Sequence, residues 1–239
     1  MGTLTATSPQ LCRWHDFSTT AELEQSAAHA ILQAAEAAVR LRGAFHIVLA
    51  GGTTPRRIYA ALRKADADWN AWHVYFSDER CLPAYHPERN SKMAMETWLD
   101  QVSIPPGQIH PIQAELGAGI AASAYAKTLK NIPLFDLVLL GLGEDGHTAS
   151  LFPGHDLGSA VDSPAVLAVG NAPKFPPQRV SLGAHRLSAA RKVFFIVSGA
   201  SKKKAIQNWL HGIPIPAAAI RPQDGIDVYL ETALLETNH

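Results

Sequence analysis

The stretch Phe135-Asp-Leu-Val-Leu-Leu-Gly-Leu-Gly-Glu-Asp-Gly-His-Thr-Ala-Ser-Leu-Phe-Pro153 decides the fold of this chain. Its aliphatic run, Leu137 to Leu140, has no polar break and predicts a strand buried on both faces, as in a parallel sheet. The glycines that follow predict a sharp turn carrying Asp145 and His147. Ligands of open α/β sheets bind at the carboxyl ends of strands, so we expect this carboxylate and this imidazole at a functional edge.

Strand-like and helix-like segments alternate along the rest of the chain. Strands are expected at Phe45 to Ala50, His73 to Phe76, Ala165 to Val169 and Val193 to Val197, with an edge strand at Asp227 to Leu230. Helices are expected from Leu23 to Arg42, Arg56 to Lys64, Ser91 to Asp100, Gly119 to Lys130, Lys202 to Leu210 and Glu231 to Glu236, whereas residues 1–17 read as irregular. This alternation predicts one α/β domain over residues 1–239, a twisted, mostly parallel sheet with helices on both faces.

The composition excludes several classes of protein. The net charge is zero and the only basic block is Lys202 to Lys204, so nucleic acid is not expected as a partner. Two cysteines, Cys12 and Cys81, form no disulfide framework and indicate a reducing compartment. No apolar run approaches the ~18 residues that span a bilayer, and the N-terminus lacks the features of a signal peptide. We therefore expect a soluble cytoplasmic protein.

Polar residues follow four of the expected strands, at Gly51 to Thr54, Asp78 to Arg80, Gly141 to His147 and Ser198 to Lys202. Parallel strands bring these segments to one edge. Glycine amides at a helix N-terminus favour an anion, and arginine and lysine add charge-assisted bonds to phosphate. Each segment alone also reads as an ordinary turn or a solvated helix face, but together they predict a site for a phosphorylated small molecule. Of the three lysines, at most one is expected to contact it.

Other motifs are excluded on spacing. Gly141 to Gly146 matches the dinucleotide pattern G-x-G-x-x-G, but Pro153 follows too soon for the long helix that receives a pyrophosphate. Neither G-x-S-x-G nor G-x-x-x-x-G-K-[ST] occurs. A metal cluster of Asp145, His147, His155 and Asp156 is possible on paper, yet the loop after Pro153 argues against it, and no metal is expected.

Four motifs together carry a family resemblance. The chain resembles the 6-phosphogluconolactonase family over residues 14 to 235, through Gly51-Gly-Thr-Thr-Pro55, Asp78-Glu-Arg-Cys-Leu-Pro83, the stretch 141–153 and Pro176-Pro-Gln-Arg-Val180. The resemblance implies a three-layer α/β/α sandwich shared with glucosamine-6-phosphate deaminases and ribose-5-phosphate isomerases. It also implies hydrolysis of 6-phospho-D-glucono-1,5-lactone in the oxidative pentose phosphate pathway, without metal or organic cofactor.

Two alternatives to the lactonase reading stay open. Deaminases of the same superfamily carry a carboxylate where this chain has Phe152, and Asp-Glu-Tyr where it has Asp78-Glu79-Arg80. Both differences favour the lactonase. The second alternative is a sugar-phosphate sensor without catalysis, against which the intact Asp145-Gly146-His147 speaks. The oligomeric state is expected to be a monomer or a weak homodimer.

A general-base mechanism follows from these residues. His147 is expected to activate water, since an imidazole suits this task near neutral pH, and Asp145 to orient it. Amides near Gly143 and Gly146 are expected to stabilise the oxyanion. Substrate or phosphate contacts are expected from Gly51, Gly52, Thr53, Asp78, Arg80, Arg179 and Lys202, with Arg179 and Lys202 first for phosphate. The family often has serine where this chain has Arg89, which raises the question of an additional phosphate contact from Arg89.

Overall fold

The aliphatic run of the opening stretch forms strand β5 (Phe135–Gly141), next to the middle of a six-stranded sheet. The computed structural model describes residues 10–236. The sheet order is β1-β9-β8-β5-β2-β3 and every pairing is parallel. The other strands are β1 (Cys12–Phe17), β2 (Phe45–Leu49), β3 (Trp72–Phe76), β8 (Ala190–Val197) and β9 (Ile226–Glu231). Phe135 to Leu140 are all buried, which confirms a strand covered on both faces.

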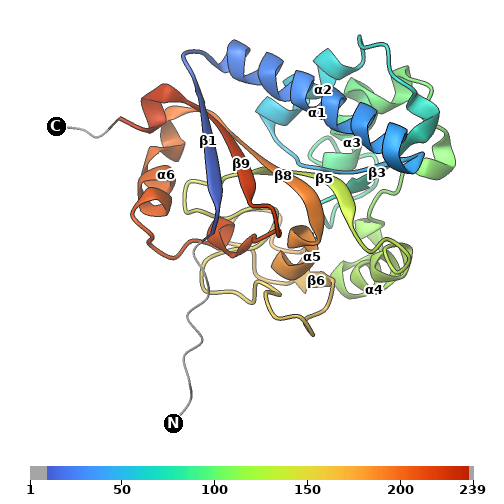
Figure 1. Ribbon diagram of the computed structural model, residues 1–239. Coiled ribbons are helices and arrows are strands. Elements are labelled where there is room, and N and C mark those ends of the chain that lie inside the picture. The colour runs from blue at the N-terminus through green and yellow to red at the C-terminus, as the bar shows by residue number, and fades with distance from the viewer. Residues whose placement is uncertain (1–9, 237–239) are drawn as a thin grey trace.

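Helices cover both faces of this sheet, which gives the three layers visible in Figure 1. The connections from β1 to β2 and from β2 to β3 run one way along the sheet, and that from β8 to β9 runs the other way. Right-handed crossovers therefore put their helices on opposite faces. One layer holds α1 (Thr20–Arg42), α2 (Thr53–Leu62) and α3 (Asn90–Thr97), and the other holds α4 (Ala118–Thr128), α5 (Ala184–Ser188) and α6 (Lys203–Leu210).

A second, three-stranded sheet lies beside the main one. Its order is β4-β7-β6, with β4 (Asp78–Arg80), β7 (Arg179–Leu182) and β6 (Val166–Val169) antiparallel to one another. The register pairs Arg80 with Arg179. Two segments that are a hundred residues apart in the sequence are thereby brought to the same edge.

Four expectations about elements were wrong. Cys12–Phe17 is a strand and not irregular, because its backbone pairs with β9. The strand was missed because its apolar and polar side chains do not alternate regularly along its whole length. Because of this pairing, β9 lies inside the sheet rather than at its edge. Only a 3₁₀ turn, Thr232–Leu234, follows β9 where a helix was expected. Helix α2 begins at Thr53, so that Pro55 stands within its first turn. Residues 1–9 lie outside the described part.

Short 3₁₀ turns make up the remaining regular structure. They are η1 (Trp69–Ala71), η2 (Leu99–Gln101), η3 (Pro106–Gln108), η4 (Ala114–Leu116), η5 (Ala200–Lys202), η6 (Pro216–Ala219) and η7 (Thr232–Leu234). Within residues 10–236 no helix has the length and apolar character needed to cross a membrane.

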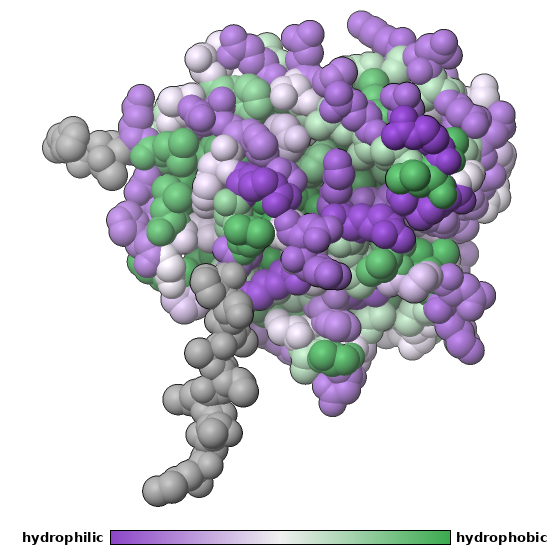
Figure 2. All heavy atoms as spheres, viewed as in Figure 1, coloured by the Kyte–Doolittle hydropathy of each residue, from purple (hydrophilic) through white to green (hydrophobic). Residues whose placement is uncertain are grey.

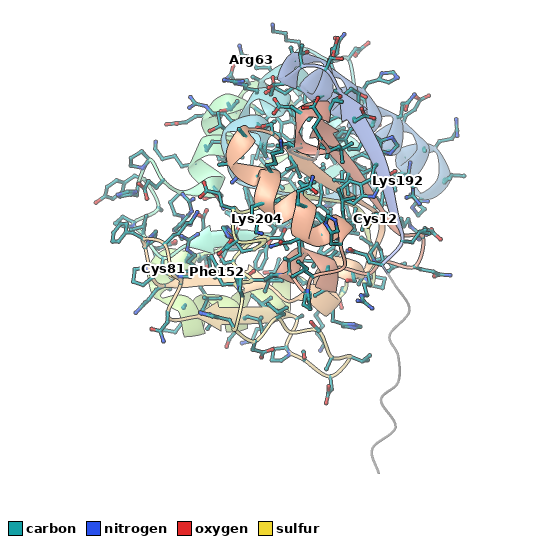
Figure 3. The ribbon with its side chains drawn as sticks, turned by 90° about the vertical axis from the view of Figure 1, so that its left-hand side faces the viewer. Cys12, Arg63, Cys81, Phe152, Lys192 and Lys204 are labelled. Atoms are coloured by element: carbon teal, nitrogen blue, oxygen red, sulfur yellow. The ribbon has the colours of Figure 1, made fainter. Side chains whose placement is uncertain are left out.

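Polar side chains dominate the face seen in Figure 2, where apolar ones form small separate groups. Cys12 and Cys81 are both free thiols, and Figure 3 shows them far apart.

Candidate active site

The carboxyl ends of β2, β3 and β5 surround a cavity of about 340 Å³. It is lined by eight of the expected site residues: Gly51, Gly52, Asp78, Arg80, Gly143, His147, Arg179 and Lys202. Thr53, Asp145 and Gly146 do not line it. Larger hollows exist, such as one of about 740 Å³ between β1 and α6, whose lining is mainly apolar. The smaller cavity combines glycines, a carboxylate, an imidazole and several cations.

His147 and Asp145 form a hydrogen-bonded pair at this cavity. The His147 Nδ1 lies 2.5 Å from Asp145 Oδ1, which also accepts the backbone N–H of His147 at 3.2 Å. An Nδ1–H that donates to the carboxylate leaves Nε2 as the basic nitrogen. The two ring centroids of His147 and Phe152 are 4.7 Å apart, so packing also fixes the imidazole. Asp145 thus stands behind His147 rather than in the cavity.

The local environment adjusts the protonation of both groups. Burial lowers the pKa of His147, and the nearby Lys174 charge lowers it further, while the hydrogen bond and charge of Asp145 oppose this. Burial acts to raise the pKa of Asp145, but its hydrogen bonds from the ring and backbone of His147 lower it overall. The pair is therefore held as a carboxylate and a neutral imidazole near neutral pH.

The glycine loop is built around His147. A Cβ atom at Gly143 would lie 1.9 Å from His147 Nδ1, so no side chain fits there. The Gly143 N–H donates to the carbonyl of His147 at 2.7 Å, and the Gly146 N–H donates to the carbonyl of Gly143 at 3.0 Å. The sequence predicted that amides near Gly143 and Gly146 stabilise the oxyanion. The N–H groups of these two glycines are used inside the loop and do not fill this role. Gly146 has a φ of 83°. A side chain at Gly146 would point at Ile215, which is outside the cavity.

Asp78 is held in place by residues that the sequence analysis missed. It is 6% exposed and accepts hydrogen bonds from Ser150 Oγ at 2.6 Å and Asn90 Nδ2 at 3.0 Å. Asn90 also donates to the Asp78 carbonyl at 3.1 Å. The Asn90 amide meanwhile fills the space above Gly51. In the sequence, Asn90 was marked only as the neighbour of Arg89, the position where the family often has serine.

Four cations line the cavity: Arg80, Lys174, Arg179 and Lys202. Of the lysines 202 to 204, only Lys202 lines it. Lys174 was missed because it stands in an irregular loop between β6 and β7. Arg179 Nε and Nη2 donate to carbonyls of that loop.

The cavity also borders the N-terminus of α2. Gly52 is the N-cap with a φ of 110°, and no side chain caps the helix. First-turn amides have no intrahelical partner, so this end favours an anion. The Thr53 side chain is exposed and off the cavity, and the Thr54 hydroxyl is hydrogen-bonded to Ser198 Oγ at 2.6 Å.

Comparisons with known proteins identify the family of this chain. Residues 18–229 match the family model described as glucosamine-6-phosphate isomerases/6-phosphogluconolactonase. The chain belongs to this family. It is 39% identical over 178 residues to the 6-phosphogluconolactonase of Synechocystis, covering 71% of this chain and 72% of the relative. The human 6-phosphogluconolactonase is 38% identical over 226 residues, covering 87% of this chain and 86% of the relative.

The fold is also that of the glucosamine-6-phosphate isomerase/6-phosphogluconolactonase family. The crystal structure of 6-phosphogluconolactonase from Thermotoga maritima superimposes with a TM-score of 0.83 at 25% identity, covering 93% of this chain and 99% of that one. This confirms the three-layer sandwich with a parallel sheet. Among residues 10–236, no three or more His, Cys, Asp and Glu side chains gather as a set that would hold a metal ion.

Arg89 has a structural place in this family member. It is 3% exposed and lies outside the cavity, so it is not placed to contact phosphate. Its guanidinium pairs with Glu79 at 3.1 Å and with Glu115 at 3.0 Å. Glu79 in turn accepts the backbone N–H of Asn90 at 2.9 Å. The buried pair therefore fixes the start of α3, which carries Asn90 into the cavity.

Phe152, labelled in Figure 3, is fully buried. It packs with Val169 and Ala172. The Phe152 ring neighbours the imidazole of His147, and the Arg179 guanidinium lies over it, 5.6 Å from the ring centroid. An apolar ring thus occupies the position next to the imidazole. It exchanges no proton.

Proposed function

We propose that the chain hydrolyses 6-phospho-D-glucono-1,5-lactone to 6-phospho-D-gluconate, a carboxylic ester hydrolysis of the oxidative pentose phosphate pathway. The observation that carries the proposal is the His147–Asp145 pair, in which Nδ1 of His147 is bonded to the carboxylate while His147 lines a cavity rich in cations. The names of the relatives support the same substrate class.

The chemistry asks for a single base. His147 Nε2 removes a proton from water while the water oxygen bonds to the lactone carbonyl carbon. When the tetrahedral intermediate collapses, the bond to the ring oxygen breaks and the imidazolium returns its proton to that oxygen. Asp145 keeps the Nδ1–H tautomer and supports the transient positive charge on the ring.

The phosphate is assigned to the cationic part of the cavity. Arg80 and Lys202 line it together with Gly51 and Gly52 at the N-terminus of α2. Cationic side chains and unpaired helix amides are the groups that bind phosphate in other proteins. This holds the substrate while the lactone carbonyl faces His147.

The two alternatives are less well supported. A deaminase-like reaction needs a carboxylate for ring opening, and the position beside His147 is the buried ring of Phe152. A sensor has no need of an imidazole kept neutral by burial and oriented by a carboxylate.

A stopped assay of lactone disappearance, corrected for spontaneous hydrolysis, tests the proposal. His147→Ala is expected to lower kcat by roughly 10²–10⁴-fold, the usual contribution of a general base, with an unchanged circular dichroism spectrum. His211→Ala, which changes an exposed histidine outside the cavity, is the matched control. A wild-type chain that does not accelerate hydrolysis, or a His147→Ala variant as fast as wild type, would refute the proposal.

A further inference from the structure

The loop between β6 and β7 is tied down by one buried arginine. Arg179 is 5% exposed, and its Nε donates to the Pro176 carbonyl at 3.1 Å. Its Nη2 donates to the carbonyls of Lys174 at 3.0 Å and Phe175 at 3.3 Å. The loop is also closed by the Ala172 N–H, which donates to the Pro177 carbonyl at 2.9 Å. Most of the N–H donors of Arg179 are thus bonded to backbone carbonyl groups of the loop and do not serve a ligand.

The side chain that this loop presents to the cavity is Lys174. It lines the cavity together with His147 and Lys202. Its charge contributes to the lowered pKa of both, after the larger effect of burial in each case. Lys174 therefore lies near enough to His147 to act on its charge, and the same holds for Lys202.

Among the described residues near His147, several candidate donors for the oxyanion are already committed. The Gly143 and Gly146 amides are bonded within their loop, and the Asn90 side-chain amide donates to Asp78. A carbonyl oxygen that becomes negative beside His147 needs a donor that is not already committed. Lys174 offers three N–H donors and a positive charge on a flexible stem.

We propose that Lys174, held at the cavity by the Arg179-bound loop, stabilises the oxyanion formed on the lactone carbonyl oxygen. As water adds, the π electron pair of the carbonyl moves to its oxygen, which faces the Lys174 ammonium. The pair returns when the bond to the ring oxygen breaks, and the resulting carboxylic acid loses the remaining water proton to solvent, which leaves the product carboxylate beside the same cation. Arg179 is in this view a positioning residue and not a phosphate ligand. The inference rests on the proposed hydrolase function.

Kinetics of Lys174→Met, Lys174→Arg and Lys204→Met test the inference. Lys174 and Lys204 are both exposed, and Lys204 is outside the cavity, so it is the matched control. Lys174→Met is expected to lower kcat by about 10²-fold, the low end for an oxyanion donor, with a smaller change in KM. Lys174→Arg is expected to recover most of the loss. The acidic limb of the rate profile moves to higher pH in Lys174→Met only, because His147 loses a neighbouring cation. An unchanged kcat, or a rise in KM alone, would overturn the inference.

Calorimetric binding separates this inference from the function itself. Lys174→Met is expected to weaken the binding of 6-phosphogluconate, which carries the product carboxylate. It is not expected to weaken the binding of glucitol 6-phosphate, which carries only the phosphate. Equal weakening of both would place Lys174 at the phosphate and contradict the inference. This result does not depend on turnover, whereas a wild-type chain without lactonase activity counts against the proposed function alone.

Discussion

The side-chain amide of Asn90 lies directly against the α-carbon of Gly51. A Cβ atom at Gly51 would be 2.0 Å from Asn90 Oδ1, closer than any real contact. The same amide donates to Asp78 through Nδ2 at 3.0 Å. One side chain therefore joins the end of β2, the start of β4 and the start of α3. The shape of the cavity depends on the absence of a side chain at Gly51.

Gly51→Ala is expected to expel the Asn90 amide and to release Asp78. A displacement of about 1 Å at a reaction centre costs on the order of 10²-fold in rate, and we expect a loss of that size in kcat/KM. The rate of lactone hydrolysis measures the loss in kcat/KM, and a thermal melt measures separately whether the fold is destabilised. Gly107→Ala is the control, since a Cβ atom there meets nothing within 4 Å. A Gly51→Ala variant with wild-type kcat/KM would contradict this account of Asn90.

The sheet was predictable because its central strands are continuous apolar runs. Leu137 to Leu140, closed by glycines, read as a strand covered on both faces, and all four are buried in β5. Strand β1 was not predictable in the same way. Its sequence, Cys12-Arg-Trp-His-Asp-Phe17, has no apolar alternation along its whole length, and its Arg13 and His15 bind Asp227 of β9 instead. Pairing of that kind is visible only once both strands are placed.

The site was predictable where reactive side chains stand on the turn directly after a strand. Asp145 and His147 stand on the turn after β5, and their pairing agrees with the orienting role expected for Asp145. The use of the Gly143 and Gly146 amides depends on how the loop folds back on itself, which no sequence pattern states. Lys174 reaches the cavity from a loop held by Arg179, and Asn90 reaches it from the start of α3, where Glu79 binds its backbone N–H. Such contacts join distant segments, and a single sequence does not reveal them.

Asp145→Asn is expected to change the pH dependence of hydrolysis. Asp145 acts to raise the pKa of His147 through its hydrogen bond and charge, against the effect of burial. Removing the charge lowers that pKa further, so the acidic limb of the rate profile moves to lower pH. The value of kcat falls as well, by no more than the roughly 10²–10⁴-fold that a general base contributes. A limb that stays in place or moves to higher pH would show that Asp145 does not act on His147.

Lys202→Ala is expected to raise KM with little change in kcat. Lys202 lines the cavity, and a phosphate contact is the same in the ground and transition states. A hydrogen bond to a charged group is worth about 1.5–3 kcal/mol, which corresponds to about a tenfold or larger rise in KM. Initial rates over a range of lactone concentrations measure it, with Lys204→Ala as the exposed control. A rise in KM for Lys204→Ala and none for Lys202→Ala would mean that the wrong lysine has been assigned.

Three histidines stack on one another away from the cavity. The ring centroids of His46 and His73 are 4.7 Å apart, and those of His73 and His110 are 6.2 Å apart. Tyr75 stacks on His110 at 4.6 Å. Burial lowers the pKa of all three histidines, and His73 lowers those of His46 and His110 further. The charge of Asp136 acts to raise the pKa of His46, but Asp136 also forms an ion pair with Arg42 at 2.7 Å.

The histidine stack is therefore expected to destabilise the fold in acid. Since the folded-state pKa values lie below the ordinary value of about 6.5, the unfolded chain binds more protons once the pH falls below that value. Stability is full above pH 6.5 and declines as the pH falls toward the folded-state pKa values. Urea unfolding at a series of pH values measures the decline, and His73→Gln is expected to reduce its slope because it removes the middle ring. His211→Gln, at an exposed site, should leave the slope unchanged. An unfolding free energy with the same pH dependence in wild type and His73→Gln would exclude the stack as its cause.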